Sequence, residues 1–225
     1  MNKKFLLVVL NLLALNANAH WLTAVNLGVN AVNIEKNLVY PLGDPFSSTE
    51  HYRSAYTNFH GQLALAYNFV LTGQIALALE GDADLFTGRS KHVINNWFLD
   101  ESVLAKEKLN YGFSVFALPE YRYNESLRIF AGPGVSRSQF KIYSNNTAGN
   151  VGVTGNFDQW LTGWGVKLGI ANQLTANKEL LLTYQFTQYN SLDRTGLEPL
   201  SGELLRGHYK PEANLFMIGL RMTMA

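Results

Sequence analysis

The sequence of 225 residues predicts an all-β protein, an eight-stranded antiparallel up-and-down β-barrel that crosses a membrane. The clearest sign is the segment from Trp160 to Tyr189, in which bulky apolar residues alternate with glycine, alanine, threonine, glutamine and one lysine. A period of two on both sides of a short polar turn is typical of an antiparallel hairpin. Because the polar series is small and mostly uncharged, it suits the crowded interior of a narrow barrel, and the apolar series then faces lipid.

The alternation recurs along the chain and predicts eight strands in all. They are expected near residues 21–34, 57–69, 75–80, 108–121, 127–141, 160–171, 180–187 and 215–224. The connections between them are alternately long and short, with long ones at about 35–56, 84–107, 143–158 and 190–210. In a chain of antiparallel strands that pair in sequence order, every second connection lies at the same end of the barrel. Four long loops at one end and three tight turns at the other predict the asymmetry of an outer-membrane barrel, with extracellular loops and periplasmic turns.

The first nineteen residues are expected to be a signal peptide. Lys3 and Lys4 precede the apolar run from Phe5 to Leu15, and Ala17-Asn18-Ala19 matches the small-x-small cleavage pattern. Cleavage would leave residues 20–225 as one barrel domain. Losing the two lysines lowers the formal net charge from +1 to about −1, so the charge indicates no nucleic-acid partner.

Composition excludes several kinds of site. The chain has no cysteine, which rules out disulfides and thiolate metal sites. No metal-ligand spacing occurs among the five histidines, and no cofactor motif is present. After Leu15, no apolar run approaches the roughly 18 residues that a membrane-spanning helix needs.

Charged residues in the inward series predict a structural ion-pair network inside the barrel. Lys167 would cost roughly 2–4 kcal/mol if it faced lipid near the midplane. A one-residue slip that turned it outward would also turn Trp164 and its apolar neighbours inward. An isolated charge in a low-dielectric lumen is expensive, so the inward charges are expected to pair. The residues predicted for this network are Glu80, Glu120, Lys167, Arg221 and Arg128. A gated pore or a proton-linked site is the functional alternative.

Catalytic candidates are few. His60 falls in an inward series and could act as a general base, but no positioned partner is evident from the sequence. Asp44, His51 and Ser54 contain the residue types of a nucleophilic triad within one polar loop, with nothing to fix their geometry. The lipid A deacylase barrels use a His-x-Ser pair, which neither Ser90-Lys91-His92 nor Gly207-His208-Tyr209 matches. We therefore predict no catalytic residues.

The long loops are where a specific binding function is expected. Trp97, Phe98 and Leu99 form an apolar centre in the second long loop and are a candidate contact patch. They could form an adhesive surface or fold onto the barrel rim, and rim packing is favoured because large exposed apolar patches are uncommon without a partner.

The chain resembles the small eight-stranded outer-membrane barrels of the OmpX, opacity-protein and OmpA-barrel group. The resemblance rests on the glycine-spaced segment 163–169, the turn 174–177, the strand 180–184 and the end 218–221, and extends as a pattern over most of the mature chain. Members usually end in an aromatic residue, where this chain has Met224 followed by Ala225.

The resemblance implies a monomeric, non-enzymatic surface or envelope-structural protein of the Gram-negative outer membrane, opacity- or adhesin-like, with four loops on a plugged barrel. Its implied partners are outer-membrane lipid and lipopolysaccharide, the barrel-assembly machinery during biogenesis, and a host or surface ligand at the loops. The alternatives are a lipid-modifying barrel enzyme, similar to the lipid A deacylases, and a narrow pore.

Overall fold

The computed structural model describes residues 19–40, 48–96, 101–146, 157–197 and 204–224. The candidate contact patch Trp97–Leu99 lies outside these residues, as does the predicted signal peptide up to residue 18, so both stay predictions. Within the described residues, no helix is long and apolar enough to cross a membrane.

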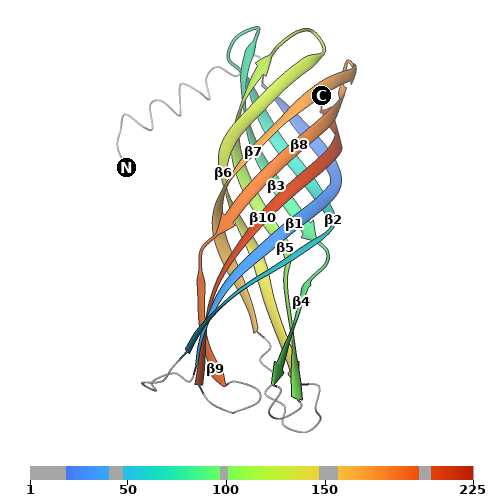
Figure 1. Ribbon diagram of the computed structural model, residues 1–225. Helices are drawn as coiled ribbons and strands as arrows, with labels where there is room; N and C mark the ends of the chain where they lie inside the picture. Colours follow the sequence, from blue (N-terminus) through green and yellow to red (C-terminus); the bar gives the residue numbers. More distant parts are fainter. Residues whose placement is uncertain (1–18, 41–47, 97–100, 147–156, 198–203, 225) are drawn as a thin grey trace, which may run out of the picture.

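The described residues form ten antiparallel strands, eight of which close into a ring (Figure 1). In chain order they are β1 (His20–Tyr40), β2 (Ser48–Val70), β3 (Ile75–Phe86), β4 (Ser90–Asn96), β5 (Glu101–Arg122), β6 (Leu127–Asn146), β7 (Phe157–Thr175), β8 (Lys178–Tyr189), β9 (Leu192–Leu197) and β10 (Leu204–Thr223). Pairing of β1 with both β2 and β10 closes the barrel. β4 pairs with β5 and β9 pairs with β10, so these two short strands extend the wall without joining the ring. The predicted eight-stranded antiparallel barrel is confirmed.

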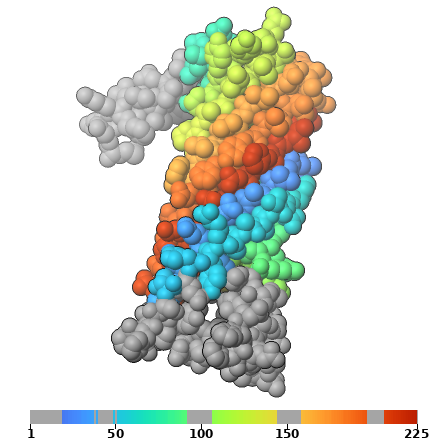
Figure 2. Space-filling model, viewed as in Figure 1, coloured from blue at the N-terminus to red at the C-terminus, as the bar shows by residue number. Residues whose placement is uncertain are grey.

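The strands are staggered around the ring, which tilts them relative to the barrel axis. Following the directly opposed residues once around the wall from Leu22 leads back to β1 at Val32, ten residues further along the strand. The path passes through Ala66, Glu80, Phe116, Gly134, Gly165, Thr187 and Ala213. Figure 2 shows the tilt on one face as diagonal bands formed by β10, β1 and β2. With eight strands, this geometry leaves an interior that side chains can fill.

The outer face carries the predicted apolar series. Val25, Leu63, Val115, Trp164 and Ile218 are each between 50 and 60 % exposed, whereas the alternate residues of the same strands face the lumen. On β5, Tyr121 and Tyr111 mark the two ends of this apolar belt. Ten residues separate them, about 33 Å along the strand. A tilt near 40° reduces this to about 25 Å of height, which is the apolar band of a membrane barrel.

Aromatic residues gather at both edges of the belt, as in barrels that span the outer membrane. At the turn end, Trp21 and Tyr67 meet edge to face with ring centroids 4.9 Å apart. At the loop end, Trp160 meets Tyr111 at 5.3 Å and stacks on Phe113 at 6.2 Å. The two edges thus match two membrane–water interfaces.

The long loops expected from the sequence are mostly strand. β1 and β2 remain paired as far as Tyr40 and Ser48, and β5 begins at Glu101, inside the segment expected to be a loop. Beyond the membrane no lipid selects apolar side chains on the outer face, so the alternation fades while the backbone pairing continues. The loss of periodicity therefore does not mark the end of a strand, and the prediction of long loops in these segments is wrong. The expected turn at 172–178 is also shorter, because β7 reaches Thr175 and β8 begins at Lys178.

Two strands of the wall are interrupted where they leave the membrane. Between β3 and β4, Gly88 has a φ of 85° and a Cβ there would lie 2.6 Å from the Asn58 side chain, so glycine is needed at this bend. Between β8 and β9, the interruption faces Pro211 of β10, which has no N–H for the ladder. β4 and β9 are thus continuations of β3 and β8 after a local break.

Gly134 on β6 makes room for the Phe116 ring inside the lumen. A Cβ at Gly134 would lie 2.2 Å from Cδ1 of Phe116, whose side chain is fully buried. We expect Gly134→Ala to lower the free energy of unfolding by about 1–3 kcal/mol, because overpacking forces the ring or the backbone to move. Urea-dependent unfolding in detergent micelles measures the change. Gly81→Ala is the matched control, because a Cβ at Gly81 has its nearest neighbour at 3.9 Å; an equal loss in both variants would contradict the assignment.

Candidate functional site

The centre of the lumen holds a cluster of charges around Lys167. β7 directs this side chain inward, where it is 2 % exposed. Its Nζ donates to Glu80 Oε1 at 2.6 Å, to Asp82 Oδ2 at 2.9 Å and to Gln62 Oε1 at 3.0 Å. Glu80 and Asp82 are successive inward positions of β3, so both carboxylates reach the same ammonium group. The same Nζ lies 5.5 Å from the ring centroid of Phe116, close enough for a cation–π contact.

Amide side chains continue this central cluster across the barrel. Gln62 on β2 donates to Asp84 at 2.9 Å and to Gln185 on β8 at 3.1 Å, and it accepts from Asn26 on β1 at 2.8 Å. Asp84 also accepts from Ser114 on β5 at 3.1 Å. The cluster thereby ties together strands from opposite sides of the ring.

His60 has a carboxylate neighbour that the sequence did not reveal. Its Nε2 lies 3.2 Å from Oδ1 of Asp84, and its side chain is fully buried. Ser114 donates to Asp84 and not to the imidazole, so His60 is not placed to take the proton of this hydroxyl. Histidine, aspartate and serine therefore lie close together, but His60 and Ser114 each contact Asp84 and not one another. This arrangement does not activate the serine as a nucleophile.

The other catalytic candidates do not come together. Asp44 lies outside the described residues. His51 and Ser54 fall on opposite faces of β2: His51 is exposed and contacts Asn37, whereas Ser54 is inside and donates to Glu107 at 2.8 Å. Ser90 is likewise inward and donates to Glu107 at 2.9 Å. Among the described residues, no group of three histidine, aspartate or glutamate side chains could hold a metal ion.

A second charged cluster closes the turn end of the lumen. Arg221 on β10 donates to Glu120 at 2.6 Å and to Glu179 at 2.7 Å. Arg128 on β6 pairs with Glu179 and lies 3.6 Å from Glu120. The Arg221 guanidinium also lies 5.8 Å from the ring centroid of Phe130. Two arginines and two glutamates therefore balance in charge within one layer.

A third cluster lies toward the loop end. Lys36 on β1 and Glu107 on β5 form a buried ion pair with 2.5 Å between Nζ and Oε1. Ser54 and Ser90 donate to the other carboxylate oxygen. Glu107 therefore has both oxygens occupied, as a buried carboxylate requires.

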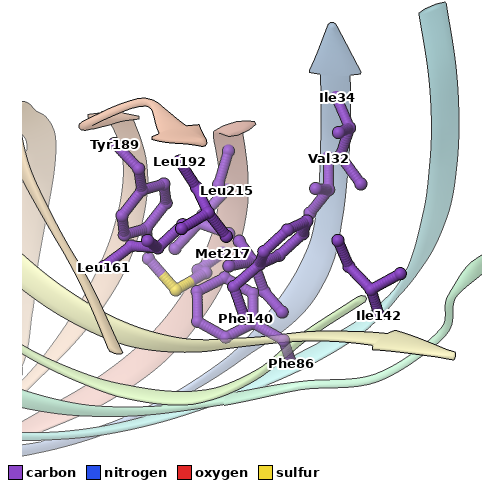
Figure 3. Packing of buried hydrophobic residues seen from close by; sticks show 12 residues of the cluster. Val32, Ile34, Phe86, Phe140, Ile142, Leu161, Tyr189, Leu192, Leu215 and Met217 are labelled. Atoms are coloured by element: carbon purple, nitrogen blue, oxygen red, sulfur yellow. The ribbon is translucent and has the colours of Figure 1, made fainter. Parts of the chain in front are cut away.

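Two apolar layers separate the three charged clusters. The layer toward the loop end draws residues from most of the wall, and Figure 3 shows Phe140, Phe86 and Met217 converging in the lumen. The second layer, between the central and turn-end clusters, contains Phe116, Leu118 and Phe130 among smaller residues. The described lumen is thus filled by alternating apolar and charged layers.

The structure places all five residues of the predicted network inside the wall but divides them between two clusters. Glu80 and Lys167 belong to the centre, and Glu120, Arg128 and Arg221 belong to the turn end. Sequence reasoning missed their partners Asp82 and Glu179, and also Asp84, which contacts His60 and Gln62. These three residues fall in inward series, between one and four positions beyond the strand ends expected from the sequence, so longer strands would have identified them. Lys36 and Glu107 lie on parts of β1 and β5 beyond the apolar belt, where the alternation fades and the sequence predicts loops.

We expect Lys167→Met to lower the free energy of unfolding by about 3–5 kcal/mol, because it leaves two buried carboxylates without their cation. The unfolding temperature in detergent, followed by heat-modifiable gel mobility, measures this loss. Lys141→Met is the matched control: Lys141 pairs with the exposed Asp158 at 3.0 Å, so at most about 1 kcal/mol should be lost. An unchanged unfolding temperature for Lys167→Met would show that the central pairs do not stabilise the barrel.

No protein-family model and no curated protein sequence matches the chain. Solved structures do. OprG from Pseudomonas aeruginosa matches with a TM-score of 0.50 and 12% identity, over 91% of this chain and 97% of that one. The outer-membrane protease OmpT from Escherichia coli matches with a TM-score of 0.48 and 11% identity, over 91% and 97%. Neisserial surface protein A matches with a TM-score of 0.38 and 13% identity, over 91% and 98%. Together with the closed wall and its apolar belt, the likeness to OprG shows that this chain has the fold of the small outer-membrane β-barrels of Gram-negative bacteria.

Proposed function

We propose that this protein is a non-enzymatic surface protein of the outer membrane, in which a filled barrel carries rigid hairpins away from the bilayer. The observation that carries the proposal is the length of the wall beyond the apolar belt. From Val29, at the edge of the belt, β1 continues to Tyr40 while paired with β2, about 36 Å along the strand. The hairpin formed by β1 and β2, which remains paired as far as Tyr40 and Ser48, therefore projects well beyond the lipid surface.

The layered interior supports a structural role for the barrel. Charged clusters at three levels pair their members across the lumen, and apolar layers fill the space between them. Such an interior holds the hairpins in a fixed position. Its side chains occupy the space that a transport pathway would need. It accounts for the predicted plug and argues against the narrow-pore alternative, which predicts discrete conductance steps in planar bilayers.

The lipid-modifying alternative requires a reactive group that lipid can reach. His60 and Asp84 lie inside the wall, 0 and 4 % exposed, and Ser114 is turned toward the carboxylate. A lipid headgroup outside the barrel would have to cross the wall to meet them. Comparing the lipid A acyl chains of cells with and without the protein tests this alternative; a change that His60→Gln abolishes would overturn the non-enzymatic proposal.

The surface role predicts that binding depends on the connections and not on the wall. Cells that display the protein should adhere to surfaces coated with laminin, fibronectin or heparin more than cells without it. Replacing residues 41–47 and 147–156 by short glycine-serine turns should remove the difference, because in chain order these residues join β1 to β2 and β6 to β7. Heat-modifiable mobility should be unchanged and serves as the control for folding. Adhesion equal to that of cells without the protein on all three coatings would contradict a role in contact with these ligands.

A further inference from the structure

Four lysines face outward on adjacent strands just beyond the loop-end edge of the apolar belt. Lys91 on β4 lies directly opposite Lys106 on β5, and Lys108 on β5 lies directly opposite Lys141 on β6. We call Lys91, Lys106, Lys108 and Lys141 the lysine cluster. Like charges directly opposed across two strands destabilise a sheet. Here this happens twice, in neighbouring rows of one surface.

The described residues supply little negative charge to offset the cluster. Asp158 on β7 binds Lys141 at 3.0 Å, and this contact raises the pKa of Lys141. Lys108 donates to the neutral Asn110 at 3.3 Å. Arg89, which is exposed just before β4, adds a further positive charge to the same side. The cluster therefore carries an excess of positive charge across three strands, about 10 Å of wall at the usual strand spacing.

A groove in the apolar belt lies directly below the lysine cluster. Its floor is made of the small outward residues Gly61 on β2 and Ala83 on β3, and its walls include Leu27, Leu85 and Phe113. The volume is about 360 Å³. A side chain at Gly61 would meet no atom within 4 Å, so the groove is open at that point. Because this face of the belt lies in lipid, the groove must be filled by hydrocarbon.

The groove and the cluster share strands, which sets the distance between them. β5 runs from Phe113 and Tyr111 at the groove to Lys108, and Lys108 lies three residues, about 10 Å, beyond Tyr111. Tyr111 and Trp160 mark the membrane–water boundary between them. An acyl chain in the groove would therefore place its headgroup at the level of the lysines.

We propose that this face of the barrel binds an acylated lipid of the outer leaflet that carries at least two phosphate groups, with one acyl chain in the groove and the phosphates on the lysine cluster. Several separated cations with one carboxylate among them match two phosphates better than the single phosphodiester of a common phospholipid. The lysine cluster is thus compensated by the lipid and not by the protein, which explains why opposed lysines are tolerated. The proposal does not depend on the adhesive role of the connections.

The test measures binding of diphosphoryl lipid A to the folded full chain in detergent, from the rise in unfolding temperature with lipid concentration. Lipid A whose phosphates have been removed and inorganic phosphate are the comparison ligands. Diphosphoryl lipid A should bind tightest, and inorganic phosphate should give no measurable shift. Equal binding of the dephosphorylated lipid would overturn the role of the lysines. Protection by inorganic phosphate equal to that by the lipid would overturn the role of the groove.

Variants assign the two parts of the site. Lys106→Gln with Lys108→Gln should weaken binding of diphosphoryl lipid A about thirtyfold, since each basic residue near an anionic headgroup contributes about fivefold. The control is Arg53→Gln with Lys210→Gln, which removes the same charge from exposed residues that flank Glu35 on another part of the wall. An equal loss in both double variants would show a general charge effect and overturn the site.

Gly61→Leu tests the groove separately. The new side chain enters open space, so the unfolding temperature without lipid should be unchanged. Displacing part of an acyl chain should weaken binding of diphosphoryl lipid A about tenfold. Unchanged affinity in this variant would show that the groove does not hold an acyl chain of the lipid bound at the lysine cluster.

Discussion

Closure of the wall between β1 and β10 is the constraint on which the rest of this structure depends. A strand edge in lipid would leave unpaired backbone N–H and C=O groups at a cost of several kcal/mol each, so only a closed ring can span the bilayer. The pairing from Leu22 with Thr223 to Val39 with Arg206 satisfies these groups along nearly the whole of both strands. With eight strands, the closed ring leaves a narrow interior, and every inward residue must fit with residues from the opposite wall.

The narrow interior explains the layered lumen. Charges that cannot reach water are stable only when they are paired and hydrogen-bonded, and the pairing partners come from strands on other sides of the ring. Lys167 on β7 therefore meets Glu80 and Asp82 on β3, whereas Arg221 on β10 meets Glu120 on β5. These contacts cross the lumen and add to the ladder that holds neighbouring strands. Apolar layers around Phe116 and Phe140 occupy the levels between them.

The outer face changes character at the edge of the membrane, and function follows that boundary. Within the belt, exposed leucine, valine and aromatic side chains suit lipid, and the small residues Gly61 and Ala83 leave room for an acyl chain. Beyond it, the strands continue with polar and basic outer residues, including the opposed pair Lys91 and Lys106. The same wall thus presents a lipid-binding surface at the interface and rigid hairpins above it, which is consistent with a role in holding connections at the cell surface.

The sequence by itself determined the barrel, because bulky apolar residues alternate with small polar ones. This alternation is imposed by lipid on the outer face and by the crowded lumen on the inner face. It also placed Lys167, Glu80, Glu120, Arg128 and Arg221 on the inner face, since a shift of one residue would turn whole apolar series inward. Which of these charges meet was decided only by the tertiary structure. The stagger of the ring brings Glu80 to Lys167 but carries Glu120 to Arg221, and strand parity alone holds no information about that stagger.

The lengths of the strands were likewise decided only by the tertiary structure, because the alternation of apolar and polar residues ends before the strands do. Outside the membrane, the ladder between β1 and β2 persists to Tyr40 by hydrogen bonds that do not depend on side-chain polarity. The same holds for the opposed lysines, which become neighbours only when β4, β5 and β6 are paired in register. The alternation is visible in the sequence because the outward side chains must suit lipid. Backbone pairing and register do not depend on the alternation, so they become visible only in the folded chain.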